Sequence, residues 1–359
     1  MIRTVITALA VLPLLSFAQP RETEHVFLIT LDGLRWQELY SGADSLLIAN
    51  SDYVGQPEAL AEQFWSDDPV ARREALMPFF WTVIAGEGQL YGNRSYENLV
   101  DVTNTRLFSY PGYNEILTGF ADDRIISNAK IDNPNRTVLE FVNEQAGFEG
   151  RVAAFGSWDV FPWIINETRS GIPVNAGFRT AEGDDLTERE QFLNALQPQV
   201  PSPWTTVRLD AFTHHYAMEY LNRERPRLLY IAYGETDDFA HDGNYEAYLK
   251  SAHQTDAFIR ELWDWVQADD DYRGKTTFII TTDHGRGEGD QWTGHSAFVE
   301  GSDAIWVAVL GPDSHPLGEV KTAGQLFQNQ VARTAAAFLG LEYTNNRPVG
   351  DVFIPIPGR

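Results

Sequence analysis

The chain of 359 residues contains no cysteine. Disulfide bonds, thiol nucleophiles and thiolate metal sites are therefore excluded, and the fold is indifferent to whether its compartment is oxidising or reducing. Any metal ion must be bound by carboxylate, imidazole or hydroxyl groups. The length allows one large domain or two of ordinary size, and either could bury a substantial core.

Basic residues are scarce: 27 lysines and arginines face 51 aspartates and glutamates, which gives a formal net charge of -24. Nucleic-acid duplexes and anionic membranes both select for lysine and arginine on their partners, so the composition argues against both. The same charge is unfavourable for an anionic substrate such as a phosphate ester. Divalent cations held in a site can reverse the local field, so the net charge does not exclude a small anionic substrate.

No apolar run is long enough to span a bilayer, which takes roughly 20 residues. The run from Val5 to Phe17 follows Arg3 and is succeeded by the small residue Ala18, which is the layout of a cleavable secretory signal. We expect residues 1–18 to be a signal peptide cleaved after Ala18. The mature protein is then expected to be soluble and either periplasmic or secreted.

Strand-like and helix-like segments alternate along the chain. Helical periodicity is clearest over Tyr245–Val266 and over Leu326–Phe338, where Gly340 suits a C-cap, and another helix opens over Thr137–Phe141. This alternation predicts an α/β fold, a three-layer α/β/α sandwich around a mostly parallel sheet. Five apolar runs have the character of buried parallel strands: 25–31, 151–155, 227–233, 276–282 and 304–310.

Two stretches interrupt this alternation, near residues 41–104 and 161–226. Both are rich in tryptophan, proline, asparagine and acidic residues, and the first has a helix-like segment at Ala71–Ile84. We interpret them as insertions in a single catalytic domain of residues 19–359, where they cap the edge of the sheet and shape the substrate pocket. The chain shows no internal repeat and no low-complexity tract.

The least ambiguous motif is Asp283-His284, which ends the apolar run 276–282 and is followed by a glycine-rich loop leading to His295. Polar side chains at the end of a buried strand need partners, and a metal ion would satisfy both of them. Asp32 also follows an apolar run, although an Asp-Gly pair at such a position is more often a simple turn. In an open α/β sheet, the loops after the strands form the ligand site.

Asp237 and His241 lie four residues apart after the run 227–233. If this segment is helical, both side chains lie on one face and can bind the same ion. A surface Asp–His pair is the simpler alternative, because acidic residues are common in this segment. Four other histidines are not flanked by a motif of this kind, and we interpret them as surface or packing residues: His214, His215, His253 and His315.

Ser109 is the candidate nucleophile. Pro111 suits the first turn of a helix, which would place Ser109 at or just before the N-cap, where free backbone N–H groups favour an anion. A capping serine without any chemistry fits this segment equally well. The position of Ser109 within the wider pattern favours the catalytic role.

In their order and strand context, these residues resemble the alkaline phosphatase superfamily, and the likeness runs from Asp32 to His295. The segment Ser109-Tyr-Pro-Gly-Tyr-Asn, followed by Ile116-Leu-Thr-Gly119, is similar to the nucleophile segment of the nucleotide pyrophosphatase/phosphodiesterase branch. In that branch a threonine usually stands at the position of Ser109. The resemblance implies two divalent ions, expected to be zinc, one held by Asp237, His241 and His295 and the other by Asp32, Asp283 and His284 with Ser109 as a further ligand.

The resemblance also implies an exported hydrolase of phosphoric esters whose partner is a small-molecule phosphate ester. Ser109 would attack phosphorus and form a phosphoseryl intermediate that water then hydrolyses. Asn128 matches an asparagine that hydrogen-bonds a phosphate oxygen in this branch, although a plain loop asparagine fits as well. Lys130 and Arg151 are candidates for holding the extra charge of a monoester. The preference between mono- and diesters, and the oligomeric state, are left open.

Three alternatives are compatible with parts of this pattern. A sulfatase shares the fold, but its motif has an arginine where this chain has Tyr113. Phosphoglycerate mutase-like enzymes are also relatives, but an intracellular role conflicts with the expected export. A binding protein that has lost catalysis on this scaffold conflicts with intact candidates for every ligand. Zinc content and turnover of p-nitrophenyl phosphate esters would separate the enzyme from the binding protein, which would be metal-free and inactive.

Overall fold

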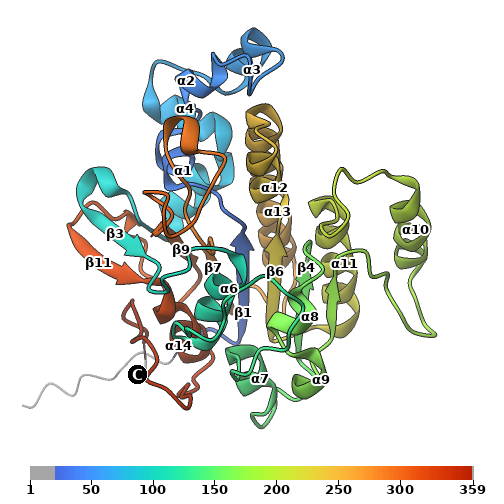
Figure 1. Cartoon of the computed structure of the whole chain (residues 1–359). Helices are drawn as coiled ribbons and strands as arrows, with labels where there is room; N and C mark the ends of the chain where they lie inside the picture. Colours follow the sequence, from blue (N-terminus) through green and yellow to red (C-terminus); the bar gives the residue numbers. More distant parts are fainter. Residues whose placement is uncertain (1–20, 358–359) are drawn as a thin grey trace, which may run out of the picture.

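The computed structural model describes residues 21–357, so the predicted signal peptide lies outside the described residues. An eight-stranded sheet, with strand order β10-β2-β9-β7-β1-β6-β4-β5, forms the centre of the molecule (Figure 1). Its middle strands run parallel: β7 (Thr276–Thr281), β1 (His25–Leu31), β6 (Leu228–Tyr233) and β4 (Val152–Gly156). The prediction of an α/β fold with a mostly parallel sheet is confirmed.

Both faces of the sheet are buried, because successive residues of β1 point into two different cores. Phe27 and Ile29 belong to one core, whereas Val26 and Leu28 belong to the other. The first core is covered by α11 (Asp210–Glu224) and α13 (Tyr245–Ala268), and the second by α6 (Ser109–Thr118), α7 (Val138–Asn143) and α14 (Val331–Phe338). Helices therefore lie on both sides of the sheet, as the three-layer prediction requires.

Two predicted elements are wrong in part. The run 304–310, expected to be one parallel strand, is split at Trp306 into β8 (Ala304–Ile305) and β9 (Val307–Leu310), and β9 is antiparallel to β7. The loop between β7 and β8 contains only a short 3₁₀ turn, so no crossover helix returns the chain for parallel pairing. Leu326 belongs to β11 (Gly324–Phe327) rather than to a helix, and α14 begins only at Val331.

The segment 41–104 supplies strands as well as helices. Its helices α2 (Ser45–Ile48), α3 (Pro57–Phe64) and α4 (Pro69–Leu76) gather with the preceding α1 (Trp36–Ser41) at the end of the molecule toward which the arrow of β1 points (Figure 1). A π-helical turn (Phe80–Ile84) and α5 (Ala85–Glu87) lead to β2 (Gln89–Tyr91) in the main sheet, next to β10 (Gly318–Glu319). Strand β3 (Asn98–Asp101) pairs with β8 and β11 in a small second sheet.

The segment 161–226 also adds to the main sheet. It contains α8 (Phe161–Ile164), α9 (Glu167–Ser170), the edge strand β5 (Val174–Ala176), α10 (Glu188–Leu196) and α11. Strand β5 pairs in parallel with β4. Within residues 21–357, none of the helices combines the length and the apolar character needed to cross a bilayer.

Candidate functional site

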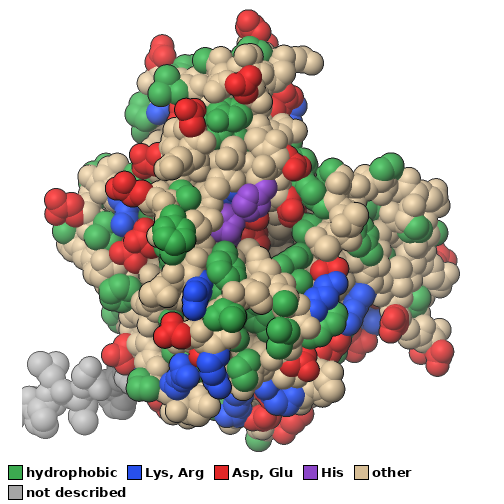
Figure 2. Space-filling view, in the orientation of Figure 1, with side chains coloured by type: hydrophobic (Ala, Val, Ile, Leu, Met, Phe, Trp, Pro, Cys, Tyr) green, Lys and Arg blue, Asp and Glu red, His purple; other side chains and the backbone are tan. Residues whose placement is uncertain are grey.

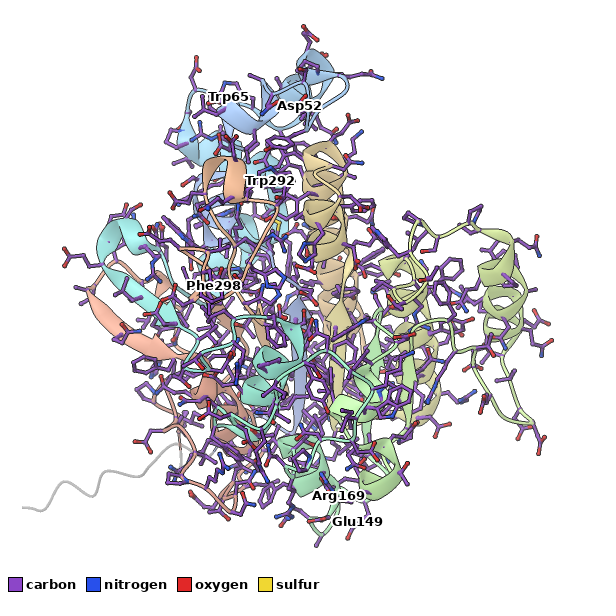
Figure 3. The ribbon with its side chains drawn as sticks, in the orientation of Figure 1. Asp52, Trp65, Glu149, Arg169, Trp292 and Phe298 are labelled. Carbon is purple, nitrogen blue, oxygen red and sulfur yellow. The ribbon has the colours of Figure 1, made fainter. Side chains whose placement is uncertain are left out.

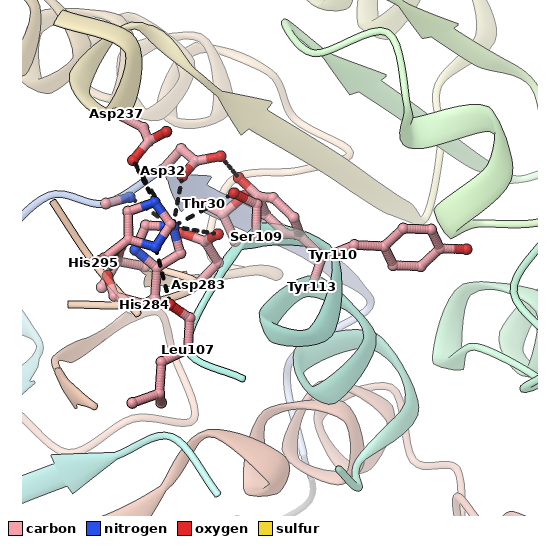
Figure 4. A network of polar contacts seen from close by, with 12 residues as sticks. Thr30, Asp32, Leu107, Ser109, Tyr110, Tyr113, Asp237, Asp283, His284 and His295 are labelled. Carbon is pink, nitrogen blue, oxygen red and sulfur yellow. Dashed lines mark hydrogen bonds and ion pairs between the residues drawn. The ribbon is translucent and has the colours of Figure 1, made fainter. Parts of the chain in front are cut away.

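The predicted site residues converge at the carboxyl ends of three neighbouring parallel strands (Figure 4). Asp32 directly follows β1, and Asp283 and His284 follow β7. Asp237 and His241 lie on α12 (Glu235–His241), which begins just after β6, so the predicted helical spacing of this pair is observed. Parallel neighbours end at the same edge of a sheet, which brings segments about 200 residues apart in sequence into contact.

Three of these side chains, Asp32, Asp283 and His284, form what we call the inner cluster. Nε2 of His284 lies 3.4 Å from Oδ1 of Asp32 and 3.4 Å from Oδ2 of Asp283. Ligands of a tetrahedral zinc ion at about 2.0–2.1 Å are roughly 3.3 Å apart, so the spacing fits a metal ion. Both of these carboxylate oxygens are buried and have no hydrogen-bond partner. A cation between the three groups would satisfy them.

The outer cluster consists of Asp237, His241 and His295. Nε2 of His241 lies 3.2 Å from Oδ2 of Asp237 and 3.0 Å from Nε2 of His295, and Nε2 of His295 lies 3.6 Å from Oδ1 of Asp237. The side chain of His241 is 46% exposed, so the outer cluster opens to solvent whereas the inner cluster is buried. Figure 2 shows histidine side chains in a hollow at the centre of this face, next to acidic groups.

Backbone carbonyl groups orient two of the imidazole rings. Nδ1 of His284 lies 3.0 Å from the carbonyl oxygen of Gly285, and Nδ1 of His295 lies 2.9 Å from that of Leu107. A carbonyl oxygen can only accept, so Nδ1 carries the proton in both rings and Nε2 presents its lone pair to the clusters. Burial and the neighbouring His284 lower the pKa of His295 to about 2, which keeps its ring neutral.

Each carboxylate of the inner cluster accepts a hydrogen bond through one of its two oxygens. Tyr113 donates its hydroxyl to Oδ2 of Asp32 at 2.8 Å, and the N–H of Gly33 donates to Oδ1 of Asp283 at 3.1 Å. Burial, reinforced by the charge of Asp237, raises the pKa of Asp32 well above its usual value. Burial and the charge of Asp32 do the same to the pKa of Asp283. The ionised forms of these carboxyl groups are therefore unfavourable without a cation, and bound divalent cations would stabilise them.

Arg286 is a site residue that the sequence reasoning missed. Its guanidinium is buried and donates to Oδ1 of Asp237 and to the carbonyl oxygens of Trp292 and Thr293, the latter two residues before His295. Burial alone would raise the pKa of Asp237, but the charge of Arg286 holds it well below its usual range. Arg286 thereby ties α12 to the loop that carries His295. A basic residue three positions after Asp283 in a buried segment was the available signal.

Ser109 lies beside the inner cluster, with its Oγ 3.4 Å from Nε2 of His284. It is the first residue of α6 rather than the N-cap, which is Phe108, and its hydroxyl does not cap the helix. The hydroxyl faces the cluster because the helix start lies directly against the Asp283 backbone. A Cβ at Gly112 would lie 2.4 Å from the carbonyl oxygen of Asp283, so only glycine allows this approach. Asn128 is close by, and its Oδ1 accepts from the N–H of Tyr110 at 3.0 Å.

A cavity of about 180 Å³ opens onto these groups. The sequence reasoning did not identify its walls at Trp158, Thr206 and Val207, because they come from loops whose position depends on tertiary packing. The lining contains no lysine or arginine: Asp32, Ser109, Asn128, Trp158, Thr206, Val207, Gly234, Asp237, Asp238, His241 and His295.

The two predicted phosphate-binding cations are not brought to this cavity. Lys130 forms an ion pair with Asp159 at 2.7 Å. Arg151 precedes the first residue of β4, whereas the site lies beyond the carboxyl ends of the strands. Figure 3 shows Glu149, two residues before Arg151, at the opposite end of the molecule from Trp292. Arg151 is therefore excluded as a substrate contact, because it lies at the amino end of β4 and the site lies at the carboxyl ends of the strands.

The comparisons with known proteins agree with this architecture. A model described as the Metalloenzyme superfamily matches residues 200–343, which include all predicted ligands except Asp32 and Ser109. The alkaline phosphatase PafA superposes with a TM-score of 0.60 at 10% identity, covering 95% of this chain and 100% of PafA. The chain has the fold of the alkaline phosphatase superfamily. No curated protein matches it in sequence.

Two further structures share this superfamily fold with the chain. The lipoteichoic acid synthase LtaP from Listeria monocytogenes gives a TM-score of 0.58 at 11% identity, over 92% of this chain and 75% of LtaP. The phosphonate monoester hydrolase SpPMH from Silicibacter pomeroyi gives 0.52 at 14% identity, over 89% and 73%. The resemblance to the superfamily is confirmed at the level of the fold, whereas the phosphodiesterase branch stays a prediction. The metalloenzyme match and the grouping of possible ligands at the site, Asp32, Asp283 and His284 in one group and Asp237, His284 and His295 in another, indicate divalent metal binding.

Proposed function

We propose that this protein is a phosphoric-ester hydrolase that uses Ser109 as nucleophile at two divalent metal ions, zinc being the expected metal. The observation that carries the proposal is the position of Ser109 Oγ, 3.4 Å from a histidine nitrogen that is itself 3.4 Å from two unpartnered carboxylate oxygens. A hydroxyl in this position is a neighbour of whatever cation the inner cluster holds. The proposal is also supported by the fold shared with the alkaline phosphatase PafA and the phosphonate monoester hydrolase SpPMH, because both names describe hydrolases of phosphorus esters.

In this proposal the inner cluster and Ser109 hold one ion, and the outer cluster holds the other. When bound, such ions supply positive charge that favours the ionised hydroxyl and stabilises charge on the phosphoryl and leaving oxygens. Ser109 Oγ then forms a bond to phosphorus as the ester oxygen departs. The resulting phosphoseryl group is hydrolysed by water, which returns Ser109 to its starting form.

Asn128 is proposed to bind a non-bridging phosphate oxygen. The N–H of Tyr110 can only donate, so the amide atom that faces it is Oδ1. The amide nitrogen of Asn128 is thereby left as a donor, and Asn128 lines the same cavity as Ser109. Since Tyr110 directly follows the nucleophile, the contact fixes Asn128 relative to the reacting oxygen.

Diesters are the proposed substrate class. A monoester carries about two negative charges near neutral pH, whereas a diester carries one, and enzymes that bind a terminal phosphate need additional cationic donors. The cavity lining supplies none, and it includes the carboxylate of Asp237, whose pKa is held well below its usual range. Lys130 is paired with Asp159, and Arg286 is committed to Asp237. The walls therefore favour the substrate with less charge.

The test is a comparison of kcat/KM on one zinc-loaded preparation with bis-p-nitrophenyl phosphate, p-nitrophenyl phosphate and p-nitrophenyl sulfate. We expect the diester to be the best of the three, and Ser109→Ala to abolish its turnover while both ions stay bound. Ser127→Ala, an exposed serine next to Asn128, is the matched control and should retain full activity. Faster turnover of the sulfate ester would refute the phosphoric-ester assignment, and an active Ser109→Ala would remove the nucleophile.

Export to the periplasm or outside the cell is part of the proposal and rests on residues 1–18 of the sequence alone. N-terminal sequencing of the protein recovered from a periplasmic or culture fraction should begin at Gln19. A product that retains Met1 would contradict it.

A further inference from the structure

We infer that His214, His215 and Glu261 form a further cation site, remote from the catalytic chemistry and suited to a first-row divalent ion such as Zn²⁺. The side chains come from α11 and α13, which lie side by side (Figure 1). A ring nitrogen of each histidine and a carboxylate oxygen of Glu261 all lie within 4.8 Å of one another. We call this group the α11–α13 site, and it does not depend on the proposed function.

Packing holds the two histidine rings in place. Phe258, one helical turn before Glu261 on α13, stacks on the ring of His214 at 4.3 Å between centroids and meets the ring of His215 edge-on at 6.2 Å. Nε2 of His214 lies 3.1 Å from Oε2 of Glu261, close to the spacing of roughly 3.3 Å between ligands of a tetrahedral zinc ion. One pair of donor atoms is therefore already at ligand spacing, and a nitrogen of His215 lies within 4.8 Å of both.

The protonation states also suit a cation. Burial lowers the pKa of both His214 and His215, so both rings are neutral near pH 7 and each offers a lone pair. Nδ1 of His214 lies 3.0 Å from the hydroxyl oxygen of Tyr233, which can accept a hydrogen bond from Nδ1–H and so direct the Nε2 lone pair toward Glu261. This hydrogen bond is the usual support for a metal-binding histidine.

A hydrogen bond from Nε2–H of His214 to Oε2 of Glu261 explains their contact without a metal, but it leaves His215 unexplained. Nδ1 of His215 is enclosed and has no hydrogen-bond partner. The side chain of Glu261 is 50% exposed, which gives an ion access and leaves room for water as a fourth ligand. The nearby cation Arg189 is paired with Glu219 at 3.0 Å. Two imidazoles and one carboxylate are a common donor set for Zn²⁺.

The experiment counts zinc per chain by equilibrium dialysis of the stripped full-length protein, followed by metal analysis. Glu261→Gln and His215→Ala are each expected to bind one zinc fewer than wild type and to keep their activity on bis-p-nitrophenyl phosphate. Asp264→Asn, an exposed carboxylate one turn along α13, is the matched control and should bind as many ions as wild type. Equal zinc content in wild type and Glu261→Gln would overturn the inference.

Two features keep the outcome decisive. Glu261 is half-exposed and glutamine has the same shape, so Glu261→Gln tests the site even if His215→Ala does not fold. Asp283→Asn disables the inner cluster, and the one-zinc difference caused by Glu261→Gln should persist in that background. Persistence there separates this site from the catalytic ions, whereas disappearance of the difference would show that the lost zinc belonged to the catalytic centre and would overturn the inference.

Discussion

Replacement of Tyr113 by phenylalanine removes a single oxygen atom from the support of the inner cluster. The ring of Tyr113 is buried and packs edge-on against Phe161 at 4.8 Å, a contact that phenylalanine preserves. Burial raises the pKa of Tyr113 well above its usual value, so the hydroxyl keeps its proton and donates it to Oδ2 of Asp32. The substitution therefore leaves that oxygen buried without its donor.

The expected loss can be worked out from this contact. A hydrogen bond to a charged acceptor contributes about 1.5–3 kcal/mol, and a factor of ten in affinity corresponds to about 1.4 kcal/mol. Metal binding by the inner cluster should therefore weaken roughly 10- to 100-fold, the range typical of residues that support metal ligands. Competition between the protein and a fluorescent zinc chelator measures this change directly, without reference to catalysis.

Tyr110→Phe is the matched control for this prediction. Tyr110 lies on the same helix and is equally buried, but its hydroxyl donates to the carbonyl oxygen of Ile131 at 2.6 Å and points away from Asp32 (Figure 4). Both variants lose a buried phenolic hydrogen bond, and only Tyr113→Phe should lose metal affinity. Unchanged affinity in Tyr113→Phe, or an equal loss in the control, would refute the reasoning.

Three further predictions concern other parts of the molecule. Asn128→Ala should lower kcat/KM for bis-p-nitrophenyl phosphate roughly 10- to 100-fold with metal content unchanged, because one donor to a charged oxygen is lost. Arg286→Gln should destabilise the metal-free protein by about 3–5 kcal/mol in urea unfolding, since Asp237 loses its buried partner. Burial lowers the pKa of His25 to about 4, so below pH 6.5 the unfolded chain gains a proton that the folded chain does not, and stability falls. Between pH 7 and pH 4, the free energy of unfolding of His25→Phe should therefore fall by about 3 kcal/mol less than that of wild type, as measured by urea unfolding at each pH.

The parts of the fold that could be predicted from the sequence are those whose local pattern agrees with their tertiary environment. Strand β1 and helix α13 begin at the predicted residues, because a strand buried on both faces is continuously apolar and a long amphipathic helix is strongly periodic. Strand β11 was mistaken for the start of a helix, because its residues are mostly exposed and Leu326 happens to continue the spacing of α14. Short edge strands carry little such signal.

The difference between local pattern and tertiary contact also explains which site residues could be predicted from the sequence. Asp32, Asp283 and His284 follow apolar strands, and Asp237 and His241 lie at helical spacing, so local patterns identify them. Ser109 and His295 lack such a local pattern and are identified from their order in the chain and the family resemblance. Arg286 and Tyr113 escape such reasoning, because their partners Asp237 and Asp32 lie 49 and 81 residues away and come within reach only when the sheet forms. Groups that support a ligand are thus defined by tertiary contacts rather than by sequence spacing.

The placement of charge reconciles an acidic protein with the anionic substrate that we propose. The inner and outer clusters contain three carboxylates, and two divalent ions would exceed their charge, while the buried cation of Arg286 offsets Asp237 further. The field at Ser109 would then be positive although the molecule as a whole is strongly negative. The absence of lysine and arginine from the cavity walls follows the same logic, because attraction of the substrate would come from the bound ions. Substrate affinity should accordingly depend on metal loading rather than on surface charge.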